Sequence, residues 1–199
     1  MRLNIVLFDS ENIQPDLIEK LAHEHFRAVI FLGAKQKRLD LNIVKPFQAL
    51  GNNGEIIQIA GNGPNALDFH IAFYIGKYSK EYPDPYFHII SKDKGFDPLI
   101  LHLKDLNIFC SRWESVSEIP FIRISGAKLH ELAAEYYEKK ILKTKSRPVK
   151  EKTLFTSINA HFHNLLPEDS VNKIIEVFKQ SGKITIKDNK IIYKDKPRK

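Results

Sequence analysis

The first 125 residues alternate between short apolar runs and longer segments of helical periodicity. The apolar runs that we interpret as strands are Leu3–Phe8, Ala28–Leu32, Glu55–Ile59, Tyr86–Ile90 and Asn107–Cys110. The segments that we interpret as helices are Pro15–Phe26, Leu41–Leu50, Pro64–Tyr78 and Asp97–Leu106. Strands that alternate with helices predict a parallel sheet covered by helices, which is an α/β fold.

Composition excludes several classes of protein. The chain has 199 residues, 43% of them hydrophobic, which is enough for one domain, or for one domain with a small appendage. The single cysteine, Cys110, excludes an intramolecular disulfide framework and a cysteine-rich zinc module. Asp9 interrupts the first apolar run too early for a signal peptide, and no run is long enough for a transmembrane helix. We therefore expect a cytoplasmic protein with no membrane partner.

The positive charge is concentrated in the last part of the chain. Residues 1–125 contain 14 basic and 15 acidic residues, whereas residues 126–199 contain 17 and 9. Residues 139–152 hold seven basic residues, one acidic residue and Pro148, a composition typical of a linker. We predict a domain at 1–125, a helix and basic linker at 126–150, and a small basic domain at 151–199. A basic appendage favours a polyanionic partner such as nucleic acid, although a solvated tail has the same composition.

Four aspartates lie where a parallel sheet binds its ligands, beyond the carboxyl ends of the strands. Asp9 and Asp93 follow predicted strands. Asp68 lies in the first turns of one predicted helix, and Asp97 opens another. Carboxylates brought together repel one another, and a divalent cation removes that conflict. Mg²⁺ and Mn²⁺ prefer hard oxygen ligands, so the pattern favours a site for one of these ions, which can activate water against a phosphodiester.

Each of these acids also has a structural interpretation. Asp97 followed by Pro98 is a good helix N-cap. Asp68 would be stabilised by the dipole of its helix without any metal ion. Asp9 and Asp93 could be ordinary turn residues at the ends of strands. The residue pattern alone leaves both interpretations open.

Three motifs occur in a specific order and spacing: DSEN at 9–12, GNGPNALD at 61–68 and SKDKGFDPL at 91–99. In these motifs the region 1–125 resembles the bacterial PIN-like nuclease family of the NYN type. The resemblance implies a three-layer α/β/α sandwich with a parallel sheet, and metal-dependent cleavage of RNA. It also implies that Asp9, Asp68, Asp93 and Asp97 hold the metal ion and act in catalysis, with Asn12 as a helper. Asn12 and its neighbour Glu11 could equally shape the loop.

Basic side chains are expected at the same edge of the sheet, where they could hold phosphates on either side of the scissile bond. They are Lys35, Lys37 and Arg38 after the second strand, and Lys92 and Lys94 beside Asp93. Solvated loops have similar compositions, so this interpretation is not unique.

One of these three motifs also fits a pattern that competes with the nuclease interpretation. Gly61–Ala66 fits G-x-G-x-x-A, the outline of a dinucleotide-binding turn. It follows the third strand instead of the first, and Pro64 removes an N–H that a phosphate would use. A flexible turn that places Asp68 explains the glycines better.

The C-terminal part is expected to contain two helices followed by a β-hairpin around Asp188-Asn189. This order resembles the end of a winged helix, and also the small RNA-binding modules of the OST-HTH (LOTUS) type, which would make it a small α+β domain. Lys173, Lys183 and Lys187 would then face nucleic acid. A protein-docking module is the alternative for this part.

These patterns together favour an Mg²⁺- or Mn²⁺-dependent ribonuclease acting on single-stranded RNA, with RNA held by the basic C-terminal domain. One alternative is a non-catalytic RNA-binding or regulatory protein. Another is a DNA-binding winged-helix regulator, and RNA-over-DNA preference would distinguish it through the 2′-OH. A homodimer would widen a shallow nucleic-acid groove.

Overall fold

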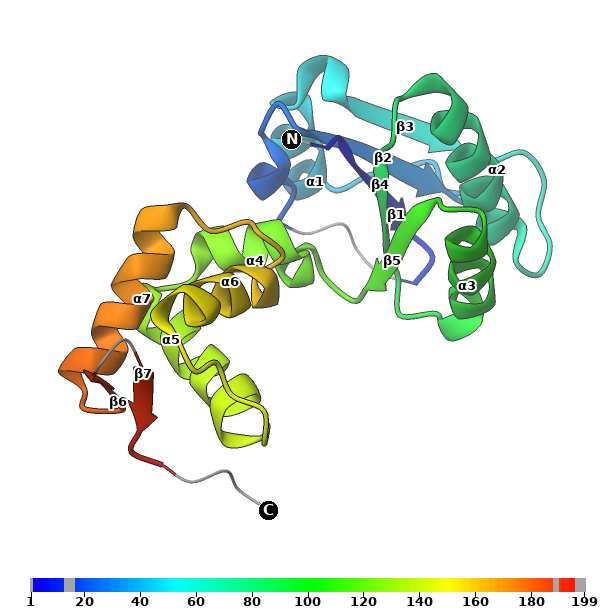
Figure 1. Ribbon diagram of the computed structural model, residues 1–199. Helices are drawn as coiled ribbons and strands as arrows, with labels where there is room; N and C mark the ends of the chain where they lie inside the picture. The colour runs from blue at the N-terminus through cyan, green and yellow to red at the C-terminus, as the bar shows by residue number, and fades with distance from the viewer. Residues whose placement is uncertain (1, 13–16, 188–189, 196–199) are drawn as a thin grey trace. The chain divides into compact units, whose positions relative to one another are not determined.

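The chain divides into two compact units, residues 1–119 and residues 120–199, which we call the N-terminal and C-terminal units (Figure 1). The computed structural model describes residues 2–12, 17–187 and 190–195. Each unit has its own hydrophobic core. The division falls at Ile119, earlier than the sequence analysis placed the end of the first domain, and residues 126–150 belong to the C-terminal unit.

The N-terminal unit is built on a five-stranded sheet in the order β3-β2-β1-β4-β5. The strands are β1 (Asn4–Asp9), β2 (Phe26–Leu32), β3 (Gly54–Gln58), β4 (Tyr86–Ile90) and β5 (Phe109–Trp113). All neighbouring strands pair in parallel, with Phe8 opposite Ile90 and Asp9 opposite Phe31. The predicted parallel sheet is therefore confirmed, and the carboxyl ends of its strands share one edge.

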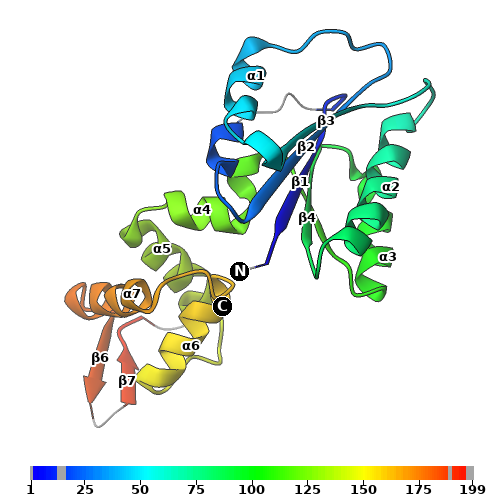
Figure 2. The same ribbon diagram turned by 90° about the horizontal axis from the view of Figure 1, so that it is seen from above.

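Helices cover both faces of this sheet. Figure 2 shows α2 (Ala66–Glu81) and α3 (Asp97–Asp105) on one side, and α1 (Leu41–Gln48) on the other. The longest of them, α2, buries Leu67, Ile71 and Ile75, whose spacing of four residues places them on one face. Short 3₁₀ turns complete the connections at Gly51–Asn53, Lys94–Phe96 and Val116–Glu118. The result is the expected three-layer α/β/α sandwich.

The helix expected at Pro15–Phe26 is wrong in the part that the structure describes. Residues 13–16 lie outside the described residues, and the following segment forms only the 3₁₀ turn η1 (Ile18–Leu21). A three-residue spacing is enough to bury both Ile18 and Leu21. Polar residues follow, and Phe26 is already the first residue of β2. The apolar side chains therefore need a single turn and not a long helix.

His88 is a buried polar residue in the centre of the sheet. Its Nδ1 accepts a hydrogen bond from Trp113 Nε1 at 3.0 Å, so its Nε2 carries the proton and donates to Asn4 Oδ1 at 2.9 Å. Burial lowers the pKa of His88 to about 3, so the ring stays neutral near pH 7. Both nitrogens are satisfied, and the ring joins β1, β4 and β5 by side-chain hydrogen bonds.

The C-terminal unit packs helices and a hairpin around one core. Its elements are α4 (Pro120–Gly126), α5 (Leu129–Tyr136), the π-helix η5 (Tyr137–Leu142), α6 (Glu151–His161), α7 (Glu168–Gln180), β6 (Ile184–Lys187) and β7 (Lys190–Tyr193). The two strands pair antiparallel, as the hairpin prediction requires, although the Asp188-Asn189 turn lies outside the described residues.

The linker expected at residues 139–152 is not a connection between two units. Its first residues extend α5 as η5, and Ile141 and Leu142 are buried in the same core as Ile158 and Phe178. Lysines flank this apolar pair on both sides, and they remain exposed at the surface. The composition of the segment is that of a linker, but two apolar side chains are enough to anchor it.

Trp113→Phe should lower the free energy of unfolding by about 1–3 kcal/mol, because it leaves the buried His88 Nδ1 without a donor. Urea denaturation followed by circular dichroism measures this change. The double variant His88→Leu/Trp113→Phe removes both partners, so it should lose less stability than the sum of the two single variants. Additive losses would show that the hydrogen bond contributes nothing.

Candidate functional site

The strand order reverses between β1 and β4, because the chain moves outward to β2 and β3 and then returns to the other side of β1. In open parallel sheets, ligands bind at this switch point, beyond the carboxyl ends of the strands. Asp9 is the last residue of β1, and Ser91 directly follows β4. The two side chains therefore meet at the position where this fold has room for a ligand.

Asp9 is fully buried, and its carboxylate is held by three hydrogen bonds. Its Oδ2 accepts from Asn12 Nδ2 and from Ser91 Oγ, each at 2.6 Å, and its Oδ1 accepts from the backbone N–H of Glu11 at 3.2 Å. Burying a carboxylate is costly unless such donors satisfy it. The predicted helper Asn12 thus contacts a predicted acid directly, and it fixes the orientation of that carboxylate.

Ser91 connects Asp9 to Asp93. Its hydroxyl donates to Asp9 and at the same time accepts from the backbone N–H of Asp93 at 3.0 Å. Asp93 in turn accepts from the backbone N–H of Gly95 at 2.7 Å and caps the 3₁₀ turn that follows. One buried serine therefore sets the positions of carboxylates that follow two neighbouring strands.

Asp68 approaches the same edge from the first turn of α2. Partial burial, followed by the negative charges of Asp9, Asp93 and Glu11, raises the pKa of Asp68 from 3.8 to about 6. Carboxylates from separate elements thus act on one another electrostatically. We call Asp9, Glu11, Asp68 and Asp93 the acid cluster.

Glu11 is the member of the acid cluster to which the sequence analysis assigned no firm role. A Cβ atom on Gly33 would lie 2.8 Å from Glu11 Oε1, so the carboxylate of Glu11 rests over a glycine that follows β2. The only signal in the sequence was its place in the DSEN motif, two residues after Asp9.

Asp97 has a different partner from the other predicted acids. Its Oδ1 accepts from Arg112 Nε at 3.0 Å, and Arg112 also donates to the backbone carbonyl of Ser91 at 3.0 Å. Asp97 is not among the charges that shift the pKa of Asp68. Arg112 therefore holds one oxygen of Asp97, and a direct role at a metal ion would fall to the other oxygen, Oδ2. Sequence analysis missed Arg112, because only the pairing of β4 with β5 brings it to the site.

The side chains of the acid cluster are suitable ligands for a hard divalent cation. No three His, Cys, Asp or Glu side chains within residues 2–12, 17–187 and 190–195 are arranged as a ready-made metal site. The cluster nevertheless presents only carboxylate oxygens, which are the ligands that Mg²⁺ and Mn²⁺ prefer. Asp68 accepts no hydrogen bond from the described residues, so a cation would relieve repulsion that no donor there offsets.

The predicted basic residues lie at the same sheet edge. Lys35, Lys37 and Arg38 are exposed in the loop after β2. Ser10 Oγ donates to Gln36 Oε1 at 3.2 Å, and Gln58 Nε2 donates to the carbonyls of Ala34 and Gln36, which fixes this loop. A cavity of about 470 Å³ is lined partly by Lys37 and Arg38. On the other side of Asp9, Lys92 and Lys94 are exposed next to Asp93.

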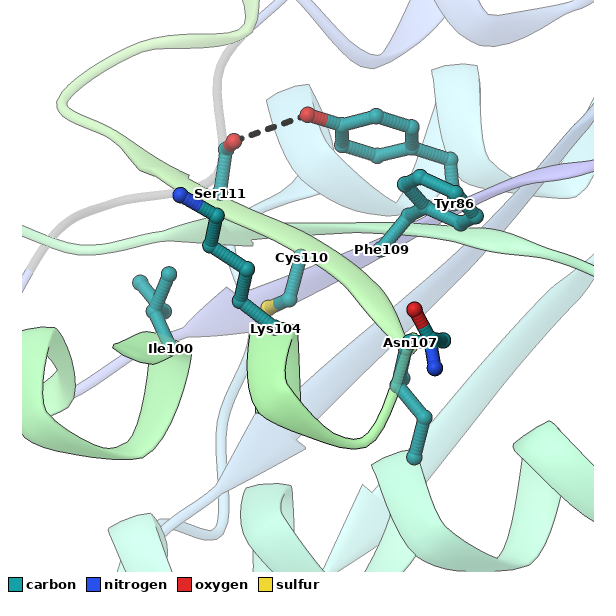
Figure 3. A pocket seen from close by; sticks show the side chains of 8 residues that line it. Tyr86, Ile100, Lys104, Asn107, Phe109, Cys110 and Ser111 are labelled. Atoms are coloured by element: carbon teal, nitrogen blue, oxygen red, sulfur yellow. Dashed lines mark hydrogen bonds between the residues drawn. The ribbon is translucent and has the colours of Figure 1, made fainter. Parts of the chain in front are cut away.

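A second pocket, drawn in Figure 3, lies away from the acid cluster, because Tyr86 and Phe109 in its wall begin their strands. Its polar contact is a 2.9 Å hydrogen bond between Tyr86 and Ser111. Burial raises the pKa of the Cys110 thiol to about 12, so this cysteine is a poor nucleophile. The eight residues that line the pocket include no carboxylate, and we assign it no catalytic role.

Comparison with known proteins agrees with the geometry. Residues 3–113 match the family model of the PIN domain, which covers the whole sheet and the acid cluster. The chain belongs to the PIN domain family. PIN domains are generally metal-dependent nucleases. No curated protein and no solved structure matches the chain.

The match supports a PIN domain but not the finer NYN type, and it does not extend to the C-terminal unit. Both of those resemblances stay predictions. No helix in the described part of the chain has the length and apolar character needed to cross a bilayer.

Asp68→Asn should raise the melting temperature of the metal-free PIN domain protein at pH 8. Because the pKa of Asp68 is about 6 in the folded protein, above the ordinary value of 3.8 expected in the unfolded chain, ionisation destabilises the fold. This penalty is absent below about pH 4, grows as the pH rises through about 6, and is fully present at pH 8. The difference between variant and wild type should therefore disappear as the pH falls to about 4.

Thermal melts in EDTA across this pH range measure the effect. Asp105→Asn is the matched control, because it removes the same charge from an exposed position at the end of α3. Added Mn²⁺ should stabilise the wild type more than Asp68→Asn. A variant that melts below the wild type at pH 8 would contradict the proposed repulsion.

Proposed function

We propose that this PIN domain protein is an Mg²⁺- or Mn²⁺-dependent ribonuclease that hydrolyses phosphodiester bonds of single-stranded RNA. The observation that supports it best is the acid cluster at the switch point of the sheet, where partial burial and the neighbouring carboxylates raise the pKa of Asp68 to about 6. Crowded carboxylates repel one another and destabilise the fold when no cation is bound. The same cluster of negative charge attracts a divalent cation, which a metal-dependent nuclease needs.

Asp9, Asp68 and Asp93 would hold the metal ion, and Asp97 would join them through Oδ2 while Oδ1 stays paired with Arg112. When bound, the cation would polarise a phosphoryl oxygen of the substrate and activate a water molecule. The chain itself positions the donors. Asn12 and Ser91 keep one carboxylate of the cluster in a single orientation through hydrogen bonds of 2.6 Å. This arrangement needs no histidine as general base.

Basic side chains around the acid cluster would hold the RNA backbone. Lys92 and Lys94 are exposed on one side, and Lys35, Lys37 and Arg38 on the other. Phosphate contacts of this kind position the strand and carry no sequence information. Their placement on both sides of the carboxylates supports a strand that crosses the sheet edge.

The C-terminal unit would hold RNA through its hairpin. The backbone N–H of Ile191 donates to the carbonyl of Val149 at 2.8 Å, and Tyr193 Oη donates to the carbonyl of Pro148 at 2.8 Å. An extended segment before α6 therefore lies beside β7, and this arrangement supports the resemblance to a winged helix. Lys187, at the end of β6, and Lys173, on α7, are both exposed.

Charge on α7 favours contact by the hairpin over insertion of the helix into a groove. Lys179 is bound to Glu151 at 2.8 Å and to Glu176 at 2.9 Å, and the first turn of α7 carries Glu168 and Asp169. The ammonium of Lys183 lies 4.6 Å from the centre of the Tyr137 ring, near the start of β6. The acidic side chains of α7 offset its basic ones, whereas the hairpin is basic. This distribution of charge fits contacts to the nucleic-acid backbone better than base readout of DNA.

Asp93→Asn should abolish metal-dependent cleavage, because it removes a negatively charged metal ligand from the acid cluster and keeps the shape of the side chain. The assay is cleavage of end-labelled single-stranded RNA and matched DNA in Mg²⁺, Mn²⁺ or EDTA. Asp105→Asn serves as the control of equal charge. Full activity is expected for the control, and a loss of at least about a hundredfold for Asp93→Asn.

Cleavage that survives in EDTA or in Asp93→Asn would contradict the proposed site. RNA binding without cleavage by the wild type would favour a non-catalytic RNA-binding protein. Preference for DNA over RNA would favour the DNA-binding regulator.

The triple variant Lys173→Gln/Lys183→Gln/Lys187→Gln should weaken RNA binding, and more so at low salt. For a single strand, each lost phosphate contact lowers the slope of log affinity against log salt by about 0.7, so the slope should fall by roughly 2. Fluorescence anisotropy in EDTA at several salt concentrations measures it. The control, Lys20→Gln/Lys45→Gln/Lys104→Gln, changes the net charge equally within the N-terminal unit. Equal slopes in the two variants would contradict a role for these lysines of the C-terminal unit in RNA binding.

A further inference from the structure

The outward face of α2 carries two exposed aromatic rings followed by two exposed ammonium groups. Phe69 and Phe73 are 71% and 65% exposed, and Phe69 is the most exposed large hydrophobic residue in the described chain. Residues at positions i, i+4, i+8 and i+11 of a helix share one face. Lys77 and Lys80 therefore continue the face that the two rings begin. We call Phe69, Phe73, Lys77 and Lys80 the α2 stripe.

The side chains of the α2 stripe are not among the buried core residues of the N-terminal unit, and Phe73 touches that core through an edge-to-face contact with Tyr74, at 5.4 Å between ring centres. The buried face of the helix consists of Leu67, Ile71, Ile75 and Tyr78, on the opposite side. Gly76 lies between the rings and the lysines, and a Cβ atom there would meet no other atom within 4 Å. The stripe is therefore an open surface. Isolated exposed apolar residues are common on protein surfaces, but here two rings lie about one helical turn apart on the same face.

The α2 stripe begins beside the acid cluster. Asp68, whose carboxylate interacts with Asp9 and Asp93, is directly followed by Phe69. A strand held at the cluster would continue over the two rings and then reach the ammonium groups. The Lys77 ammonium lies 3.6 Å from Glu81 and also 5.3 and 5.7 Å from the ring centres of Tyr74 and Tyr78. Exposed contacts of this kind are weak, so a phosphate can compete for the ammonium.

We propose that the α2 stripe is a stacking platform for two unpaired nucleobases of the RNA strand that is cut at the acid cluster, with Lys77 and Lys80 bound to its phosphates. The identification of the strand as RNA rests on the proposed function. Aromatic side chains interleaved with cations bind single strands with little dependence on base identity, because every base has a π-face. A duplex cannot use the platform, since its bases are already stacked on one another. The site therefore selects single-stranded over double-stranded substrate.

A second copy of the chain is a less suitable occupant for this face. Two α2 stripes packed against each other around a two-fold axis would bring four ammonium groups into one interface, and neither stripe contains a carboxylate to neutralise them. Phosphates complement these charges, and bases complement the rings. The surface thus matches a single-stranded nucleic acid in both of its parts.

The test is the affinity of the full chain for a 5′-fluorescein-labelled 12-nucleotide oligouridine, measured by anisotropy in EDTA so that no cleavage occurs. Phe69→Ala/Phe73→Ala should weaken binding by about tenfold to a hundredfold. Phe69→Tyr/Phe73→Tyr keeps the rings and should bind like the wild type. Phe69→Leu/Phe73→Leu keeps apolar side chains without rings and should behave like the alanine variant.

Two controls separate stacking from general damage. Leu41→Ala, at an exposed apolar residue on the opposite face of the sheet, should leave the affinity unchanged. Affinity for a duplex of the same length should be the same in all variants. Melting temperatures confirm that each variant is folded.

Unchanged affinity in the alanine variant would overturn the stacking platform, whether or not the wild type cleaves RNA. Weaker binding of the alanine variant, together with no cleavage by the wild type, would support the platform and refute the nuclease function. A wild-type dimer that becomes a monomer in both the alanine and tyrosine variants would assign the face to a second copy, and would overturn the proposal.

Discussion

The structure of the site depends on one buried carboxylate, that of Asp9. It lies at the end of the central strand and is fully enclosed, yet three donors satisfy it at 2.6 to 3.2 Å. Two of these donors come from the residues that follow β1, and the third is Ser91 after β4. Because Ser91 also holds the backbone of Asp93, the orientation of one carboxylate sets the position of the next.

Fixing these carboxylates brings like charges together, and the burden is greatest on Asp68. Its pKa of about 6 reflects burial and three neighbouring acids, with no hydrogen bond from a described residue to offset them. Hydrogen bonds from three donors therefore orient the carboxylate of Asp9, whereas that of Asp68 on α2 accepts none from a described residue. A fold that concentrates repulsion in this way gives up stability at the site where a cation would bind.

Much of the N-terminal unit could be predicted from residue patterns. The five strands were predicted close to their observed positions because their apolar runs are short and separated by polar turns. The acids at strand ends follow from the rule that parallel strands share an edge. The helix prediction is wrong for residues 17–26, because periodicity does not reveal how few apolar residues the neighbouring sheet can bury. Ile141 and Leu142 are buried in a segment whose basic composition is typical of a linker, because composition does not reveal which apolar side chains a neighbouring core can hold.

The sequence by itself determined the α/β alternation, the chemical type of the site and the order in which its acids occur. These properties depend on local periodicity and on residues a few positions apart. Only the tertiary structure decided that Asp9 shares Ser91 with Asp93, that Asp97 pairs with Arg112, and that Glu11 rests over Gly33. These contacts join residues up to 82 positions apart. Their geometry depends on strand order and register, which local patterns do not specify.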